Sequence, residues 1–436
     1  MIAQYRRPCG QSAAAITDTQ FIHEWADHLL LEGDAVIDAS RGKPSFSASA
    51  AGLQAFTDYT QSLTKSQLSL YGTDTLGEWH YREKVAEAFT RDYGAPFNAA
   101  SIAFTPGGQF GLAMAFTCLY ERWPEAQIAA PRPWYLNHRE LAMTARNMMH
   151  LSDCEPFVAL DWLHDERIGL DPQAIAALAE QPEIKALLLC DPANPLGTVI
   201  SHESWCAIAQ LLARRSDMLV ILDAAFEETR FDATIPCPHP VLSRFGDRCV
   251  LLRSGTKALG FPGERLAVMH VPPCLMGRFT FLQSRLIGHP AMSAQAVMSE
   301  IMQSLSPEER QRIAAYYHAH AKQLYETLNA LGLSIHPQAI PQGGFFTLMD
   351  ASQLLGQLMP EGAARMGAVA GKPLKNDWDI AIAMLFGLNQ PKRSGIAAMP
   401  ASCFGIDAEK GWLRVSFSIC AADIDLLCQR LHALFA

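Results

Sequence analysis

A serine, a lysine and an arginine lie close together in the second half of the chain, after an apolar run at residues 249–252. Ser254 is followed by Lys257 and then by Arg265, in a stretch that also holds glycines and a proline. A lysine amine can form a Schiff base with an aldehyde, while a hydroxyl and a guanidinium can bind phosphate oxygens. An isolated S-x-x-K is more often a strand followed by a basic loop, but this pattern continues through Ala267. It therefore predicts a site for an aldehyde that carries a phosphate.

Two further polar residues follow apolar runs upstream of the lysine. The run at residues 218–222 ends in Asp223, a carboxylate that is costly to bury unless it meets a positive charge. A protonated pyridine nitrogen would supply that charge and would keep the ring able to accept electrons. Alternatively, Asp223 only caps the turn that follows the strand. The run at residues 184–190 leads to Asn194, an amide bracketed by two prolines. Both side chains are therefore candidates for binding a ligand.

Alternating strands and helices must position these residues. Between residues 100 and 270, apolar strand-like runs alternate with helical segments, as in a sheet wound with helices. One turn joins a strand at residues 102–105 to a helix from residue 110, and Gly108 and Gln109 lie in it. Backbone amides at the start of a helix favour an anion, so these two residues are candidate phosphate ligands.

A strand near the C-terminus carries one more candidate. Residues 412–418 form a β-type run that contains Arg414. A planar guanidinium binds a carboxylate through two parallel hydrogen bonds; an exposed arginine on an edge strand is the alternative. Helices are expected on either side of this core, beginning with one capped by Thr17 or Asp18 and ending with one from residue 421 to residue 435.

Composition limits the class of protein. The chain has 436 residues, 49% of them hydrophobic, which is enough for two domains or for one large domain with an appendage. The net charge of −9 argues against a nucleic-acid partner. No apolar run is long enough for a membrane span, and the start shows no signal-peptide pattern. The eleven cysteines are scattered without a C-x-x-C pair, so we expect reduced thiols in the cytoplasm and no metal site.

In their order and spacing these motifs resemble the class I/II aminotransferases, the fold-type I enzymes that depend on pyridoxal 5'-phosphate (PLP). The resemblance extends from about Asp38 to Ser418. It implies an α/β fold in which helices sandwich a mainly parallel central sheet in a large domain, beside a smaller α+β domain. We expect residues 61–320 to form the large PLP-binding domain, with residues 1–60 and 321–436 contributing to the small one.

The resemblance also implies a reaction and a role for each candidate. The reaction would transfer an amino group between an α-amino acid and a 2-oxo acid, with Lys257 as Schiff-base lysine and general base. The implied ligands are Asp223 for the ring nitrogen, Tyr135 stacked on the ring (with Trp134 the adjacent candidate), Asn194 for the phenolate oxygen and the substrate, Gly108, Gln109, Ser254 and Arg265 for the phosphate, Tyr71 for the phosphate of a neighbouring subunit in a homodimer, and Arg414 and Gly42 for the substrate carboxylate.

The chain departs from the family pattern at a few positions. Gly255 stands where a larger residue is usual, Asp191 replaces an asparagine, and Phe226 takes the place of a tyrosine that hydrogen-bonds the cofactor. The loss of that hydroxyl leaves open a lyase, decarboxylase, cyclase or oxidase on the same fold. A non-enzymatic sensor is disfavoured by the intact lysine. His138 is either a brace for the ring-nitrogen carboxylate or a structural residue, and the polar insertion at residues 351–378 fits no template.

Overall fold

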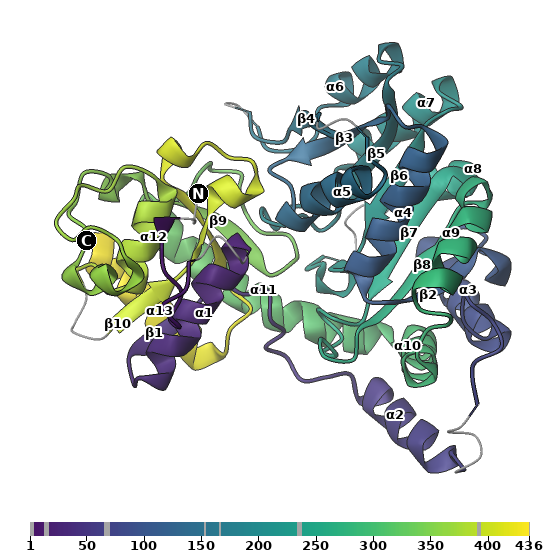
Figure 1. Ribbon diagram of the computed structural model, residues 1–436, viewed down its shortest axis with the longest axis horizontal. Coiled ribbons are helices and arrows are strands. Elements are labelled where there is room, and N and C mark those ends of the chain that lie inside the picture. The colour runs from purple at the N-terminus through teal and green to yellow at the C-terminus, as the bar shows by residue number, and fades with distance from the viewer. Residues whose placement is uncertain are drawn as a thin grey trace. The chain divides into compact units, whose positions relative to one another are not determined.

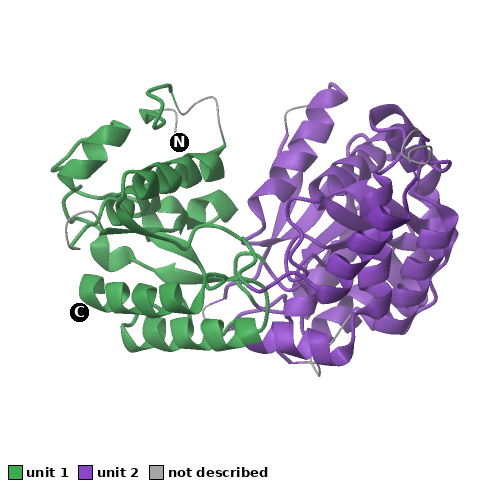
Figure 2. Cartoon of the chain, turned by 90° about the horizontal axis from the view of Figure 1, so that it is seen from below, with its two compact units in different colours: residues 1–45, 194–197, 316–436 green, residues 46–193, 198–315 purple. Residues whose placement is uncertain are grey.

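The chain forms two compact units (Figure 2). The structure, a computed structural model, describes residues 4–12, 17–64, 70–151, 154–164, 167–232, 238–389 and 394–435. Unit 1 comprises Met1–Ser45, Asn194–Gly197 and Tyr316–Ala436, and unit 2 comprises Phe46–Ala193 and Thr198–Ala315.

Unit 2 is built on a seven-stranded sheet with the order β2-β8-β7-β6-β5-β3-β4 (Figure 1). Strand β8 is antiparallel to its neighbours β2 and β7, and the other pairings in this sheet are parallel. The strands are β2 (Ile102–Pro106), β3 (Gln127–Arg132), β4 (Phe157–Asp161), β5 (Ile184–Cys190), β6 (Leu219–Asp223), β7 (Cys249–Ser254) and β8 (Leu266–His270).

Apolar runs form the central strands because a parallel sheet is covered on both faces. All residues of β6 and β7 are buried, and β5 has the bounds expected from its sequence. Helices α4 (Gly108–Arg122), α5 (Leu136–Met148) and α9 (Pro273–Leu286) form a continuous apolar core with the sheet.

The other helices of unit 2 precede, follow or connect these strands. They are α2 (Ala50–Ser62), α3 (Trp79–Tyr93), α6 (Pro172–Ala177), α7 (His202–Arg214), α8 (His239–Phe245) and α10 (Met292–Ser304), with short 3-10 turns η4 (Ala99–Ser101), η5 (Leu178–Glu180), η6 (Glu227–Thr229) and η7 (Gly246–Arg248).

The carboxyl ends of the parallel strands meet at one edge of this sheet. Cys190 at the end of β5 is opposite Asp223 at the end of β6, which in turn is opposite Leu252 near the end of β7. Ligands of wound α/β sheets bind at this edge. The fold therefore brings together loops whose sequence positions are far apart.

Unit 1 contains two small sheets. Strand β1 (Ala35–Asp38) pairs in parallel with β10 (Ser394–Ala397), and β12 (Trp412–Ser416) lies between β9 (Phe346–Asp350) and the short β11 (Met399–Pro400) in an antiparallel sheet. The central position of β12 buries Arg414, which is opposite Leu348 on one side and Met399 on the other.

Helices pack around these sheets of unit 1. Thr17 caps α1 (Asp18–Leu31) in a capping box with Gln20, as its hydroxyl chemistry favours. The segment 351–378 forms η8 (Ser352–Leu354), η9 (Glu361–Met366) and the first residues of α12 (Asp377–Leu385). The remaining elements are α13 (Ala421–Phe435), η10 (Ala401–Phe404), η11 (Ala408–Lys410) and α11 (Pro307–Ala330), which begins in unit 2 and enters unit 1 at Tyr316.

Candidate active site

Lys257 lies in the turn that follows β7, with its amine close to a buried aromatic ring. The Nζ atom is 5.6 Å from the centroid of the Phe226 ring, and Phe226 follows the end of β6. The turn is compact because Gly255 packs against Leu266, whose Cβ would be 2.9 Å from any Cβ added at Gly255. This close approach explains why glycine replaces the larger residue of the family pattern.

Asp223 and His138 form a buried pair at the carboxyl edge of the sheet. His138 Nε2 is 2.8 Å from Asp223 Oδ2, and the backbone N–H of Ala225 donates to Asp223 Oδ1 at 3.1 Å. Both side chains are almost inaccessible to solvent. His138 comes from the first turn of α5, so the structure places this histidine as a brace on the carboxylate, one of the two roles that its sequence left open.

The ring of Tyr135 packs edge-on against His138, with 5.2 Å between ring centroids. Its hydroxyl accepts a hydrogen bond from Asn137 Nδ2 at 2.7 Å and lies 3.5 Å from Gln109 Nε2. Trp134 instead packs on Phe157 and the apolar core. Of the two adjacent aromatic residues, Tyr135 is therefore the one associated with the Asp223 pair. Asn137 was not among the predicted site residues.

The start of α4 and the guanidinium of Arg265 lie together. Gly107 has a φ of +87° and packs so closely on the Arg265 guanidinium that a Cβ would overlap it. The amides of Gly108 and Gln109 belong to the first turn of α4, where helix N–H groups lack intrahelical acceptors. An exposed guanidinium next to such amides is suited to a phosphate.

Ser254, at the end of β7, is buried and already engaged within the turn. Its hydroxyl donates to Thr256 Oγ1 at 2.8 Å and accepts from the Thr256 N–H at 3.2 Å. Thr256 was missed because a threonine beside the lysine has no distinctive spacing of its own. The pair presents two hydroxyl groups beside Lys257.

These residues of unit 2 fit PLP. The aldehyde needs an amine, the ring nitrogen needs a carboxylate, and the phosphate needs cationic or amide donors. The amine is that of Lys257, and the carboxylate is that of Asp223 in its pair with His138. The phosphate donors are the amides at the start of α4 together with Arg265. Gly107, whose φ of +87° favours glycine, lets the backbone before α4 approach the Arg265 guanidinium closely, and this contact is an observation of the fold itself.

Unit 1 holds the predicted carboxylate ligand. Arg414 is buried, its Nη1 donates to Asn194 Oδ1 at 3.2 Å, and its Nη2 donates to the carbonyl oxygen of Ser40 at 2.6 Å. Rings of Phe346 and Phe404 lie 3.9 and 4.6 Å from Arg414 Cζ. The Asn194 amide oxygen and the Ser40 carbonyl oxygen are both neutral acceptors. The predicted residue Gly42 lies in the same loop as Ser40.

Tyr71 is 89% exposed and its ring packs edge-on against His289, with 5.9 Å between centroids. The structure thus leaves this predicted ligand at the surface of unit 2. His289 also accepts a hydrogen bond from the N–H of Gly72 at 3.1 Å, which fixes the backbone beside the tyrosine.

A buried ion pair stands where the chain departs from the family pattern after β5. The Asp191 carboxylate is 2.7 Å from Arg230 Nη2 and accepts from the N–H of Ile200 at 3.1 Å. Burial raises the pKa of Asp191 above its ordinary value, although Arg230 opposes this shift. Arg230 was not predicted from sequence because its partner is 39 residues away in the chain.

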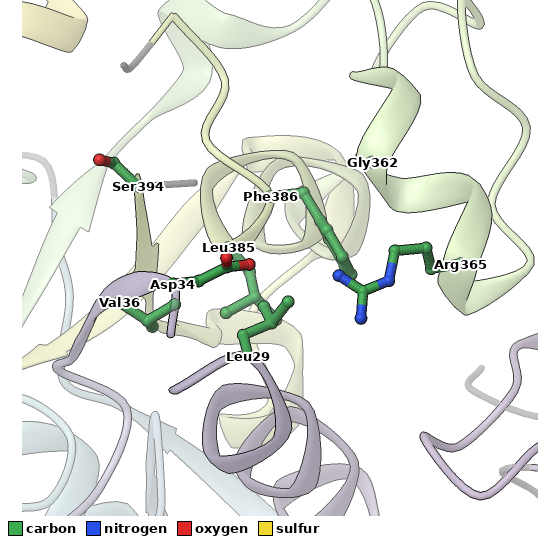
Figure 3. Close-up of a pocket in the computed structure, with 8 residues that line it drawn as sticks. All are labelled: Leu29, Asp34, Val36, Gly362, Arg365, Leu385, Phe386 and Ser394. Carbon is green, nitrogen blue, oxygen red and sulfur yellow. The ribbon is translucent and has the colours of Figure 1, made fainter. Parts of the chain in front are cut away.

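A separate cavity of about 290 Å³ lies within unit 1 (Figure 3). It is lined by Leu29, Asp34, Val36, Gly362, Arg365, Leu385, Phe386 and Ser394. None of the predicted site residues lines it, so we assign it no role in the reaction. Within the described ranges, no group of three His, Cys, Asp or Glu side chains is arranged to bind a metal.

Comparison with known proteins first supports the fold. The aspartate aminotransferase structure from Rhizobium meliloti superposes with a TM-score of 0.80 at 20% identity, covering 97% of this chain and 96% of that one. The aspartate aminotransferase from Thermus thermophilus with maleate gives a TM-score of 0.78 at 21% identity, covering 96% and 97%. The predicted fold class, that of fold-type I enzymes, is confirmed.

The sequence comparison then gives the family. Residues 35–431 match the model for aminotransferase class I and II, so the chain belongs to this family and the predicted resemblance is confirmed. Similar curated proteins include an aspartate aminotransferase of Rhizobium meliloti, 21% identical over 98% of this chain and 96% of its own length. A probable aspartate/prephenate aminotransferase of Rhizobium leguminosarum bv. phaseoli is 21% identical, with 94% of each chain covered. No helix in the described parts of the chain is long and apolar enough to cross a membrane.

Proposed function

We propose that the protein is a PLP-dependent aminotransferase that moves an amino group between an α-amino acid and a 2-oxo acid. Family membership supports this reaction. The observation that carries the proposal is the buried Asp223–His138 pair at the sheet edge, next to the strand that leads to Lys257. A carboxylate in this position needs a positive partner, and a pyridinium nitrogen is one.

PLP, when bound, supplies an electrophilic carbon and a ring that accepts electrons from the substrate Cα. The chain supplies proton transfer and orientation. Lys257 Nζ would hold the aldehyde of PLP, and as a free amine it would serve as the general base for the proton on the substrate Cα. The Asp223 carboxylate, which His138 orients, would pair with a protonated ring nitrogen and favour its charged form. Tyr135 and Asn194 would orient the ring, and the phosphate would be held by Gly108, Gln109, Ser254 and Arg265.

Arg414, together with the backbone at Gly42, binds the α-carboxylate of the substrate. The guanidinium packs against the rings of Phe346 and Phe404, and its planar fork can form two parallel hydrogen bonds to a carboxylate. The names of the relatives make L-aspartate the first amino donor to test.

Assembly, domain division and location belong to the same proposal. We expect a homodimer in which the exposed Tyr71 reaches the neighbouring active site. Residues 61–320 would form the PLP-binding domain, with residues 1–60 and 321–436 in the smaller one. A cytoplasmic location is supported by the described cysteines, none of which forms a disulfide.

Phe226 favours a second candidate, a lyase, decarboxylase, cyclase or oxidase with the same cofactor. Its ring is buried beneath the Lys257 amine and offers no hydroxyl. Supplying amino acids with and without a 2-oxo acid separates the two, because only transamination requires the oxo acid. Release of ammonia or CO2, or consumption of O2, in its absence would favour the second candidate.

The cofactor assignment is tested by spectroscopy. The purified protein should take up PLP and absorb in the visible region, and Lys257→Ala should abolish the band of the lysine-linked cofactor. Lys322→Ala is a matched control, since Lys322 is a largely exposed lysine of α11. A wild-type protein that binds no added PLP would refute the proposal.

A further inference from the structure

The turn that carries Phe404 determines how Arg414 is supported. Phe404 is fully buried at the end of η10, and its ring lies 4.6 Å from Arg414 Cζ. Strand β11 leads directly into this turn, and its residue Met399 is opposite Arg414 in the sheet. A shift of η10 would therefore move one of the two rings that pack against the guanidinium.

Asp377 is the residue that holds this turn. The Ser402 N–H, within η10, donates to Asp377 Oδ2 at 2.7 Å, and the Ser402 hydroxyl donates to Oδ1 at 3.1 Å. Asp377 is the first residue of α12, where the helix dipole favours a negative charge. A single carboxylate thus fastens η10 to the start of a buried helix.

An acid at this position is costly for folding. Asp377 is completely buried, and no lysine, arginine or histidine in the described chain forms an ion pair with it. Burial raises its pKa to about 6, although the bonds from Ser402 oppose the shift. The charged and titratable groups around this turn include Cys403 of η10, whose Sγ lies 3.8 Å from Asp18 Oδ2 of α1, and Arg414 of β12. An amide would avoid the cost of burying a charge, so packing alone does not explain the acid.

We propose that Asp377 is a positioning residue for Arg414. Through Ser402 it fixes η10, and η10 holds the Phe404 ring against the guanidinium. Asp377 does not touch the substrate; it sets the orientation in which Arg414 meets a carboxylate. This inference rests on the proposed function, in which Arg414 binds the substrate carboxylate.

The test compares holoenzyme variants. Asp377→Asn keeps the size of the side chain and removes its charge. Asp379→Asn is the matched control, because Asp379 lies in the same turn of α12 but bonds to the Lys375 N–H instead. The probes are L-aspartate with 2-oxoglutarate for KM and kcat, and maleate as an unreactive dicarboxylate whose Kd is read from the absorbance of the bound cofactor.

For Asp377→Asn we expect the KM for L-aspartate and the Kd for maleate to rise about tenfold, with little change in kcat. Wild-type Kd should rise as the pH falls through about 6, because a protonated Asp377 holds Ser402 less tightly. The part of this pH dependence that Asp377 causes should be absent from Asp377→Asn, so its Kd should change less steeply with pH than that of wild type, and Asp379→Asn should behave like wild type. If Asp377 only stabilised the fold, its replacement would not raise KM and Kd selectively and would not change the pH dependence of Kd.

Arg414→Leu separates failure of the inference from failure of the proposed function. If Arg414→Leu loses maleate binding while Asp377→Asn retains wild-type Kd and pH dependence, the positioning role is refuted and the proposed function stands. If neither variant changes Kd, Arg414 is not the carboxylate ligand, and the inference falls together with that part of the proposed function.

Discussion

Replacing Asp377 by asparagine should stabilise the protein at neutral pH. The folded protein raises the pKa of this acid from its ordinary 3.8 to about 6 because the side chain is buried. The folded state therefore binds the proton more tightly than the unfolded state does. The free energy of unfolding therefore decreases as the pH rises from about 4 to about 6. Above that range Asp377 is ionised in the folded protein, and burial of its charge destabilises the fold by the full amount.

The magnitude follows from the size of the shift. About two pKa units correspond to about 3 kcal/mol at pH values above both pKa values. This is an upper bound, because the asparagine amide must also find a partner near Ser402. We therefore expect Asp377→Asn to gain about 1–3 kcal/mol at pH 7.5 and to match wild type near pH 4.

Urea denaturation of wild type and Asp377→Asn at several pH values between about 4 and 8 measures this difference. The two proteins should diverge as the pH rises, with the variant the more stable. A variant that is less stable at pH 7.5, by an amount that does not vary with pH, would refute the reasoning. It would mean that the carboxylate stabilises the fold through its bonds to Ser402 rather than costing free energy.

Three further substitutions test other parts of the site. Arg414→Leu should reduce kcat/KM for L-aspartate roughly a hundredfold, or about 3 kcal/mol, through lost carboxylate binding; steady-state kinetics with an unchanged KM would contradict it. Phe226→Tyr supplies the missing hydroxyl and should lower the pKa of the imine between Lys257 and the cofactor by about one unit in a spectral titration of the holoenzyme. An unchanged imine pKa would show that position 226 does not contact the cofactor. Arg230→Met leaves Asp191 buried without its cation and should cost about 3–5 kcal/mol in urea denaturation, a loss that the double variant with Asp191→Asn should partly restore.

Much of the central sheet could be predicted because its signals are local. The apolar run at residues 184–190 is too short for a helix, and it forms β5 with the expected bounds. The parallel topology then places Asp223, at the carboxyl end of β6, beside the carboxyl end of β7, which leads to Lys257. This follows because the strands of successive βα units align their carboxyl ends. Local capping signals likewise predicted a helix that starts at Thr17 or Asp18, and the structure shows Thr17 as the cap.

The partners of buried polar groups could not be predicted in the same way. Asp377 holds Ser402, 25 residues away, and Asp191 holds Arg230, 39 residues away. No periodicity links such pairs, because each bond depends on how two loops meet in the fold. The segment 351–378 could not be assigned for a related reason: before the start of α12 its helical elements are short 3-10 turns, which are too short to show a repeating apolar pattern.

The most direct test of the account is to locate the covalent attachment of the cofactor. The protein is incubated with PLP and reduced with borohydride, and its peptides are then analysed by mass spectrometry. We predict a pyridoxyl phosphate group on the peptide that contains Lys257. Attachment at a different lysine, or a protein that remains unmodified, would contradict the central claim.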